Sequence, residues 1–292
     1  MPSWNIFSSS SSKNRKHHSE DPREEKLPTA DREKTLKKQS CSDSNKNEKI
    51  IEIDHLPVME QQVGKRKLKL VHMSDSHQFH EHLKNFPEGD IFIHSAIFLI
   101  RVKIVIFGNH DIGFNGISPE FVQNNVLTNA IYLQDQSVII KYKGKQLLKI
   151  YGTPWTSSRN MGFSMNRKDI EQKWNDIPND IDVLVTHLPP FGIMDLASGT
   201  EPQHYCDYCK KNHCYKRHWG NEALRKRSIQ LNEQAKLKAH LFGHVHEYHG
   251  LELEKQSNAT VPLIYSNGAS VANHNDNDVR DLNVIELDLG NE

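Results

Sequence analysis

Four short clusters of polar residues follow apolar, β-branched runs in this chain of 292 residues. In chain order they are Ser74-Asp75-Ser76-His77, Gly108-Asn109-His110-Asp111, Thr186-His187 and Gly243-His244-Val245-His246. Each cluster stands just beyond the carboxyl end of a predicted strand, where α/β sheets place their ligands. We therefore expect the four loops to converge on one site.

The clusters combine carboxylate, imidazole and amide groups. Such donors suit first-row divalent cations such as Mn, Fe or Zn, and a pair of these ions needs about this many ligands. A single histidine at a strand end is more often a structural hydrogen-bonding residue than a ligand. Four clusters in equivalent positions are hard to explain as ordinary loop polarity, so the set predicts a metal centre.

The segments that must position these clusters are mostly short apolar runs. They lie within residues 67–75, 90–96, 103–111, 137–144, 146–155, 181–190, 239–247, 262–270 and 282–289. Several runs are continuous rather than alternating, which is typical of strands covered on both faces. Helical periodicity appears in 166–174 and 221–236, so the sequence predicts a layered α/β fold.

The composition, with 36% hydrophobic and 25% charged residues, is that of a soluble globular protein. Lys+Arg and Asp+Glu both number 37, so no excess charge favours a nucleic-acid or membrane partner. No apolar run approaches the roughly 18 residues of a membrane span, and the N-terminus lacks the features of a secretory signal. We expect a cytosolic or nuclear protein, and of these we predict a cytoplasmic one.

Residues 1–48 are polar, mixed in charge and nearly free of large apolar side chains. Such a segment buries too little surface to offset its ordering entropy, so we predict a disordered tail. A phosphorylated or partner-binding tail is the functional alternative. Residues 50–292 then form a single domain.

The order DxH, GNHD, TH and GHxH resembles the signature of the calcineurin-like metallophosphoesterases. YGTPW, THLPPFGIMD, LFGHVHE and NGAS, within residues 151–155, 186–195, 241–247 and 267–270, are similar to the brain-expressed metallophosphoesterase-domain-containing subfamily. The resemblance covers the chain from about Ile50 onward. It implies a four-layer α-β-β-α sandwich and hydrolysis of a phosphodiester or a nucleotide-like phosphate.

The same resemblance implies two divalent metal ions, with manganese expected in vitro. It assigns to the first ion Asp75, His77 and His246, and to the second Asn109, His187 and His244. His110 would stabilise the phosphoryl oxygens and assist the leaving group. The implied partner is a small phosphorylated substrate or nucleotide, and the oligomeric state stays open.

One family ligand is missing. The family has Gly-Asp after the strand in 90–96, and that Asp bridges both metals, but the aligned residues here are Ala96 and Ile97. Isoleucine offers no lone pair, and a bridging carboxylate offsets repulsion between two dications, so its loss should weaken at least one site. Asp90 begins the strand and faces away. Asp111 is an alternative carboxylate that we consider weaker.

The connection after this strand is also short. In the family fold the strands at 91–95 and 103–107 run parallel, which requires a crossover of a dozen or more residues, usually with a helix. Residues 96–102 are too few for that crossover, so the simplest account is an internal deletion that removed the bridging Asp and one crossover helix. An alternative or mispredicted transcript is our preferred origin, ahead of a divergent inactive paralogue or a rearranged sheet.

We therefore expect a phosphoesterase with impaired activity, and the alternative is an inactive member that binds a nucleotide or a protein. A smaller departure is Leu188, which replaces a family Gly and would strain its loop if the position needs a positive φ.

Residues 200–220 look like an insertion rich in cysteine and histidine. Cys206 and Cys209 have the CxxC spacing of zinc sites, and Cys214 or a nearby histidine such as His218 could complete four ligands. The usual second half of a zinc motif is absent. Free surface cysteines are the alternative interpretation.

Overall fold

A computed structural model describes residues 48–53, 67–76, 83, 85–93, 102–234, 237–272 and 279–289. The predicted tail lies outside these residues except for Glu48, which begins the first strand. His77, Ala96 and Ile97 lie outside them as well.

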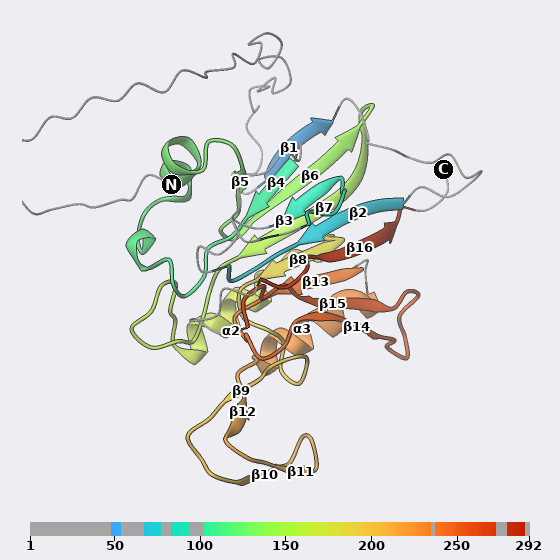
Figure 1. Cartoon of the computed structure of the whole chain (residues 1–292). Coiled ribbons are helices and arrows are strands. Elements are labelled where there is room, and N and C mark those ends of the chain that lie inside the picture. The colour runs from blue at the N-terminus through green and yellow to red at the C-terminus, as the bar shows by residue number, and fades with distance from the viewer. Residues whose placement is uncertain are drawn as a thin grey trace, which may run out of the picture. The chain divides into compact units, whose positions relative to one another are not determined.

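Two sheets form the body of the domain (Figure 1). The larger has seven strands in the order β1 (Glu48–Ile53), β6 (Gln136–Tyr142), β7 (Lys145–Thr153), β8 (Val183–Thr186), β13 (Ala239–Phe242), β15 (Leu263–Asn267) and β14 (Gly250–Glu254). The smaller has five, in the order β16 (Asn283–Asp288), β2 (Lys67–His72), β3 (Ile91–Ile93), β4 (Val102–Val105) and β5 (Ile131–Tyr132). Within them, β7-β8-β13-β15 and β2-β3-β4-β5 pair in parallel.

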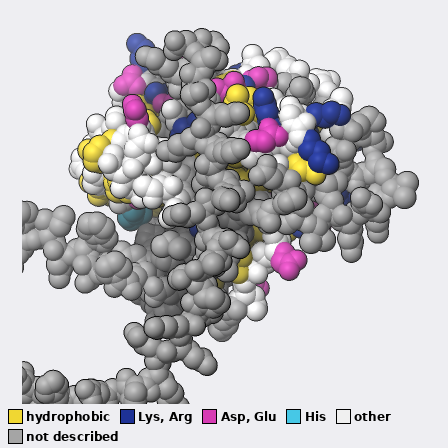
Figure 2. All heavy atoms as spheres, turned by 90° about the horizontal axis from the view of Figure 1, so that it is seen from above, with side chains coloured by type: hydrophobic (Ala, Val, Ile, Leu, Met, Phe, Trp, Pro, Cys, Tyr) yellow, Lys and Arg dark blue, Asp and Glu magenta, His cyan; other side chains and the backbone are white. Residues whose placement is uncertain are grey.

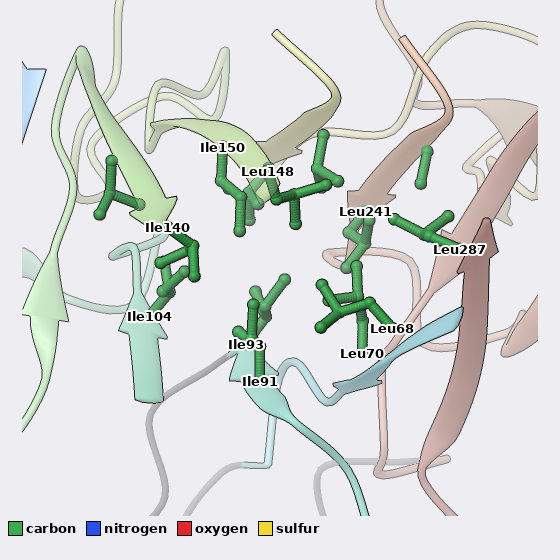
Figure 3. Close-up of a cluster of buried hydrophobic side chains, with 14 of the residues drawn as sticks. Leu68, Leu70, Ile91, Ile93, Ile104, Ile140, Leu148, Ile150, Leu241 and Leu287 are labelled. Carbon is green, nitrogen blue, oxygen red and sulfur yellow. The ribbon is translucent and has the colours of Figure 1, made fainter. Parts of the chain in front are cut away.

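The main core lies between the two sheets. Figure 3 shows Leu68, Leu70, Ile91 and Ile93 of the smaller sheet pointing toward side chains of the larger one, among them Ile150. Each of these five side chains is at most 2% exposed. The parallel strands have nearly continuous apolar sequences because their side chains are covered on both faces of the sheet.

Two helices cover the outer face of the larger sheet. α2 (Arg167–Asn175) begins at Asn166, whose side chain accepts a 3.0 Å hydrogen bond from the backbone N–H of Asp169. Ile170 and Trp174, four residues apart, are both fully buried against the sheet. α3 (Glu222–Gln234) packs through Leu224 and Leu231 in the same cluster. Both helices confirm the predicted segments, and the mixed α/β sandwich is confirmed with them.

Shorter helical segments lie beside the smaller sheet: η2 (Ile112–Phe114), α1 (Pro119–Phe121) and η3 (Val122–Val126). Val122 packs against Phe107 and Tyr132 at the β5 edge. In the described part of the chain, no helix on this side approaches the length of α2 or α3. The connection at residues 94–101, where the crossover helix is predicted to be missing, lies outside the described residues.

The strands β3 and β4 pair in parallel, with Ile91 opposite Val102. The argument that so short a connection cannot join parallel neighbours was therefore wrong, and a rearranged pairing is excluded. The return is short because β3 is only three residues long. From Ile93 at the end of β3, the chain has to return to the level of Ile91, a distance of two residues or about 7 Å, and to cross one strand spacing of about 4.8 Å before β4 begins at Val102. Residues 94–101, at about 3.3 Å each when extended, are long enough for that path.

The surface agrees with the balanced charge of the sequence. On the described atoms of the face in Figure 2, Lys and Arg side chains lie interspersed with Asp and Glu side chains. None of the described helices has the length and apolar character needed to cross a membrane.

Candidate metal centre

Three of the four polar clusters line one cavity of about 500 Å³, and the fourth, Gly243-His244-Val245-His246, adjoins it through the contacts of His244 and His246 with Asp75. The four clusters follow β2, β4, β8 and β13, whose carboxyl ends point to the same edge of the domain. The predicted site residues that line the cavity are Asp75, Asn109, His110 and His187, and Asp111 joins them. Ile93, at the end of β3, forms an apolar part of the wall.

Asp75 is the anchor of one group of candidate ligands. Its Oδ2 accepts hydrogen bonds from the backbone N–H of His244, at 2.8 Å, and from the Ser74 hydroxyl. Its Oδ1 lies 3.9 Å from Nε2 of His246. Nδ1 of His246 is 2.8 Å from the Val271 carbonyl, to which it donates. A histidine whose Nδ1 is engaged by a carbonyl presents Nε2 to its other neighbour, here Asp75, which is how proteins orient a metal-binding histidine.

Asn109, His187 and His244 form a second group. Nε2 of His187 lies 2.6 Å from Oδ1 of Asn109. The rings of His187 and His244 meet edge to face with centroids 4.9 Å apart. The family resemblance assigned these three residues to the second metal ion, and Asp75 and His246 to the first.

The protonation states in the site suit metal binding. Burial by itself would raise the pKa of the Asp75 carboxyl, but His187, His246 and the two hydrogen bonds hold that pKa well below its usual range. Burial lowers the pKa of His244 to about 3 and also lowers the pKa of His187. At neutral pH the carboxylate is ionised and these imidazoles are neutral, which are the forms that bind a divalent cation. The donor set therefore fits a divalent metal.

Asp111 brings a second carboxyl group to the cavity. Its Oδ2 accepts a 2.7 Å hydrogen bond from the backbone N–H of Gly108. Burial first, and then the negative charge of Asp75, raise the pKa of Asp111 to about 6. The weaker alternative carboxylate of the sequence argument therefore lies within electrostatic range of Asp75. His110, next to it, is exposed at the mouth of the cavity, where a substrate can reach it.

Two glycines of the motifs are required by close approach. A Cβ on Gly243 would lie 2.0 Å from both Oδ2 of Asp75 and the Ser74 hydroxyl. A Cβ on Gly108 would lie 2.5 Å from atoms of the His187 ring. Real Cβ atoms do not approach so closely, so each glycine leaves room for a candidate ligand on another strand.

The YGTPW segment supports the loop that carries Asn109. Asp135 accepts hydrogen bonds from Thr153, Trp155 and Lys173 at 2.6 to 2.9 Å. Trp155 packs against Phe163, and the backbone N–H of the neighbouring Gly162 donates to the Asn109 carbonyl at 2.7 Å. Sequence reasoning missed Asp135, because nothing in the local pattern links it to Trp155.

The loop after β8 is unstrained at Leu188. The residues with positive φ include Asp75 and His244 but not Leu188, whose side chain is buried in the cluster under α2 and α3. The strain considered for Leu188 therefore does not arise. The side chain of Thr186 is fixed by the buried His240. Nε2 of His240 lies 2.9 Å from the Thr186 hydroxyl, and its Nδ1 lies 2.9 Å from the Ser228 hydroxyl.

Trp219 is a site neighbour that sequence reasoning missed. Its ring centroid lies 5.4 Å from that of His244, and its backbone N–H donates to the Asp195 carbonyl at 2.9 Å. The one signal was its position, directly after the last histidine of the 200–220 insertion.

The insertion itself brings together Cys206, Cys209, His213 and His218. Cys214, named as a ligand candidate from the sequence, is exposed and lies outside this group. His213 takes its place.

Comparisons with known proteins agree with this geometry. The calcineurin-like phosphoesterase family matches residues 68–248. UPF0046 protein C25E10.12 of Caenorhabditis elegans is 32% identical over 226 residues, covering 65% of this chain and 72% of that protein. Human metallophosphoesterase domain-containing protein 1 is 28% identical over 225 residues, covering 63% of this chain and 62% of that protein.

The aligned lengths also show a difference in length from the C. elegans relative. Because 65% of this chain is fewer than 226 residues, the alignment with the C. elegans relative includes residues of that protein that have no counterpart here. The match of the family model to residues 68–248, which is most of the domain, establishes that the chain belongs to the calcineurin-like phosphoesterase family.

Proposed function

We propose that this protein hydrolyses phosphate esters, of the phosphodiester or nucleotide type, with divalent metal ions held at the cavity of Asp75 and His187. The observation that carries the proposal is the convergence of Asp75, Asn109, His187, His244 and His246 from different strand ends. We place the protein in the cytoplasm, with a small phosphorylated molecule as its substrate.

The site residues would have two kinds of role, metal binding and proton donation. Asp75 and His246 would hold one metal ion, together with His77, which lies outside the described residues; Asn109, His187 and His244 would hold the second. Bound metal would supply positive charge to the phosphoryl group and lower the pKa of a bound water. His110, exposed at the mouth, is placed to donate a proton or hydrogen bond to the phosphoryl oxygens or the leaving group.

The missing bridging carboxylate limits this activity. With Ile97 at that position, the described ligand candidates carry one full negative charge, on Asp75, to offset two dications. Asp111 is the one further described carboxylate on the cavity wall, and its Oδ2 is engaged by Gly108. We therefore propose turnover well below that of a complete family member, with the second metal bound more weakly.

A second candidate function is binding without hydrolysis. Ile97 favours it, because a centre that holds one metal or none can still bind a phosphate through His110 and the loop amides while lacking a poised nucleophile. In that case the protein would act as a nucleotide- or protein-binding member of the family.

The deciding experiment is elemental analysis of the purified protein together with hydrolysis of bis(p-nitrophenyl) phosphate in added manganese. Two metal ions per chain and metal-dependent turnover support the hydrolase. One metal or none, with no turnover but with saturable nucleotide binding, supports the second candidate and overturns the first.

The double variant Ala96→Gly/Ile97→Asp sharpens the distinction, because it restores the family residues at the bridging position. For an impaired hydrolase we expect a second metal equivalent and a rise in turnover of about tenfold or more. Ala96→Gly alone is the matched control. An inert double variant would show that the short connection, and not only the missing carboxylate, removes the activity.

A further inference from the structure

The insertion at residues 200–220 contains a four-residue group with the composition of a metal site. Ligand atoms of Cys206, Cys209, His213 and His218 all lie within 4.8 Å of one another. They come from the hairpin β10 (His204–Cys206) and β11 (Lys211–His213), its turn, and the end of β12 (Lys216–His218), which pairs with β9 (Leu196–Ser198). Figure 1 shows this hairpin extending away from the two sheets.

His218 is oriented as a metal ligand would be. Its Nδ1 lies 2.7 Å from Oδ1 of Asp195, and its Nε2 lies 3.2 Å from Sγ of Cys209. Asp195 is 2% exposed and fixed in turn, because its Oδ2 accepts 3.0 Å hydrogen bonds from the backbone N–H groups of Gly192 and Gly220. A carboxylate behind a histidine sets the tautomer and aims the other nitrogen, as in carboxylate–histidine–zinc arrangements.

His213 supplies an independent observation. It is 5% exposed, and within the described part of the chain its Nε2 has no hydrogen-bond partner. A buried polar nitrogen without a partner costs about 1–3 kcal/mol. A metal ion bound among the four residues would remove that cost. On the sulfur side, the backbone N–H of Cys209 donates to Sγ of Cys206 at 3.4 Å, which favours the thiolate form.

The insertion also lacks an apolar core of its own. None of the four buried apolar clusters of the described residues includes a side chain from 200–220. Its tyrosines Tyr205, Tyr208 and Tyr215 are each more than half exposed, at 58%, 53% and 57%. Two-stranded hairpins without a core are marginal in water, and small proteins of this kind are commonly held by a metal or by disulfides.

We propose that Cys206, Cys209, His213 and His218 bind one zinc ion in a closed tetrahedral Cys2His2 site that holds the insertion in its fold. Zn–S distances of about 2.3 Å and Zn–N distances of about 2.0–2.1 Å place tetrahedral ligand atoms about 3.3–3.8 Å apart. The observed limit of 4.8 Å requires a contraction of about 1.5 Å at most. All four positions are filled by protein, so the site is structural rather than catalytic.

The zinc site connects to the candidate phosphoesterase ligand His244 through Trp219. This residue directly follows His218, and its ring lies beside His244. Ser198, at the end of β9, makes a second contact with the same region. Its backbone N–H and its hydroxyl both donate 2.8 Å hydrogen bonds to Glu247, the residue after His246. Zinc bound by His218 would therefore fix the position of Trp219 against His244.

The test uses the full chain, purified with a reductant, and Co²⁺ as the probe. Tetrahedral Co²⁺ bound by thiolates gives a thiolate-to-cobalt charge-transfer band, and the phosphoesterase cavity, whose candidate ligands include no cysteine, cannot produce it. We expect the band in the wild type at one Co²⁺ per chain, displaced by one equivalent of Zn²⁺. Cys206→Ser and Cys209→Ser should lose it, whereas the matched variant Cys214→Ser should keep it.

Failure of this site and failure of the proposed hydrolase are separable. His246→Ala, which alters the phosphoesterase ligands, should leave the cobalt–thiolate band unchanged. Absence of the band in reduced wild type, or its loss in Cys214→Ser alone, would overturn the zinc site. A Cys206–Cys209 disulfide found by mass spectrometry in place of zinc would overturn it as well.

Limited proteolysis gives a second measurement that does not depend on the spectrum. The turn and β11 carry Lys210 and Lys211, which are accessible to trypsin. We expect zinc to slow cleavage there by about tenfold or more in the wild type and not in Cys209→Ser, because metal binding stabilises the folded hairpin. Equal cleavage rates with and without zinc in the wild type would contradict the structural role.

Discussion

The backbone N–H of His244 donates a 2.8 Å hydrogen bond to Oδ2 of Asp75, and both residues hold a positive φ, 70° and 49°. This conformation is rare for residues other than glycine and is tolerated where the surroundings fix it. The bond joins the loops after β2 and β13, from different sheets. It places the candidate ligands of the two metal ions next to each other.

Gly243 makes this approach feasible, so Gly243→Ala should separate Asp75 from the His244 loop. The added Cβ would lie 2.0 Å from Asp75 Oδ2. We expect a loss of about 1–3 kcal/mol in the free energy of unfolding and loss of bound manganese. Denaturant titration and elemental analysis measure the two effects. Gly113→Ala is the control, because a Cβ there meets nothing within 4 Å; equal behaviour of the two variants would contradict the argument.

His246→Ala and His110→Ala should both abolish manganese-dependent hydrolysis of bis(p-nitrophenyl) phosphate, but for different reasons. His246→Ala removes a candidate ligand beside Asp75, so metal content should fall. His110→Ala removes the exposed imidazole at the mouth, so kcat should fall by about 100-fold or more while metal content is kept. His249→Ala, whose ring interacts with Arg280 and Asp281, serves as the control. Unchanged turnover in both site variants would refute the site assignment.

Asp135→Ala should destabilise the protein and weaken the site indirectly. It removes the acceptor of Thr153 and Trp155 and leaves Lys173 without its 2.6 Å partner. We expect a loss of about 2 kcal/mol in the free energy of unfolding, measured in urea. Asp135→Asn should lose less, because Asn keeps an acceptor and tolerates the positive φ of 55°. Asp176→Ala, at an exposed position, should change stability by under about 0.5 kcal/mol.

Acid should destabilise the fold through His240. Burial lowers the pKa of this histidine from 6.5 to about 3. Between these two pKa values the unfolded chain binds a proton at His240 and the folded chain does not. The stability that neutral His240 contributes is therefore fully present above pH 6.5 and is lost as the pH falls toward 3. We expect a loss of about 3 kcal/mol between neutral pH and about pH 4 from this group.

Urea titrations across this pH range measure the effect. In His240→Gln, which keeps hydrogen-bonding groups between Thr186 and Ser228 but does not titrate, the pH dependence should be flatter by that amount. A slope identical to that of the wild type would assign the acid sensitivity to other groups.

Much of the fold could be predicted because its strands and two helices carry strong local patterns. The runs at 67–75 and 181–190 became β2 and β8, and the periodicity at 166–174 became α2 because Ile170 and Trp174 fall on one buried face. The edge strand β1 was missed. It pairs in parallel with β6, and such pairing depends on a partner far away in the sequence.

The sequence by itself determined the family, the order of the four motif clusters and the loss of the bridging Asp, because these are properties of residue type and spacing. Tertiary structure decided what depends on distance. It paired β3 with β4 despite the short connection, placed Leu188 in the core at an ordinary φ, and brought Asp111 within range of Asp75.

Tertiary structure also chose His213 over Cys214 beside Cys206 and Cys209. The two candidates are adjacent in the sequence, so their spacing could not separate them. Antiparallel pairing of β10 with β11 puts His213 opposite His204, and its side chain turns inward to the cysteines while Cys214 is left exposed. Neighbouring residues of an extended chain point in opposite directions, and only the packing of the hairpin fixes which of them faces the site.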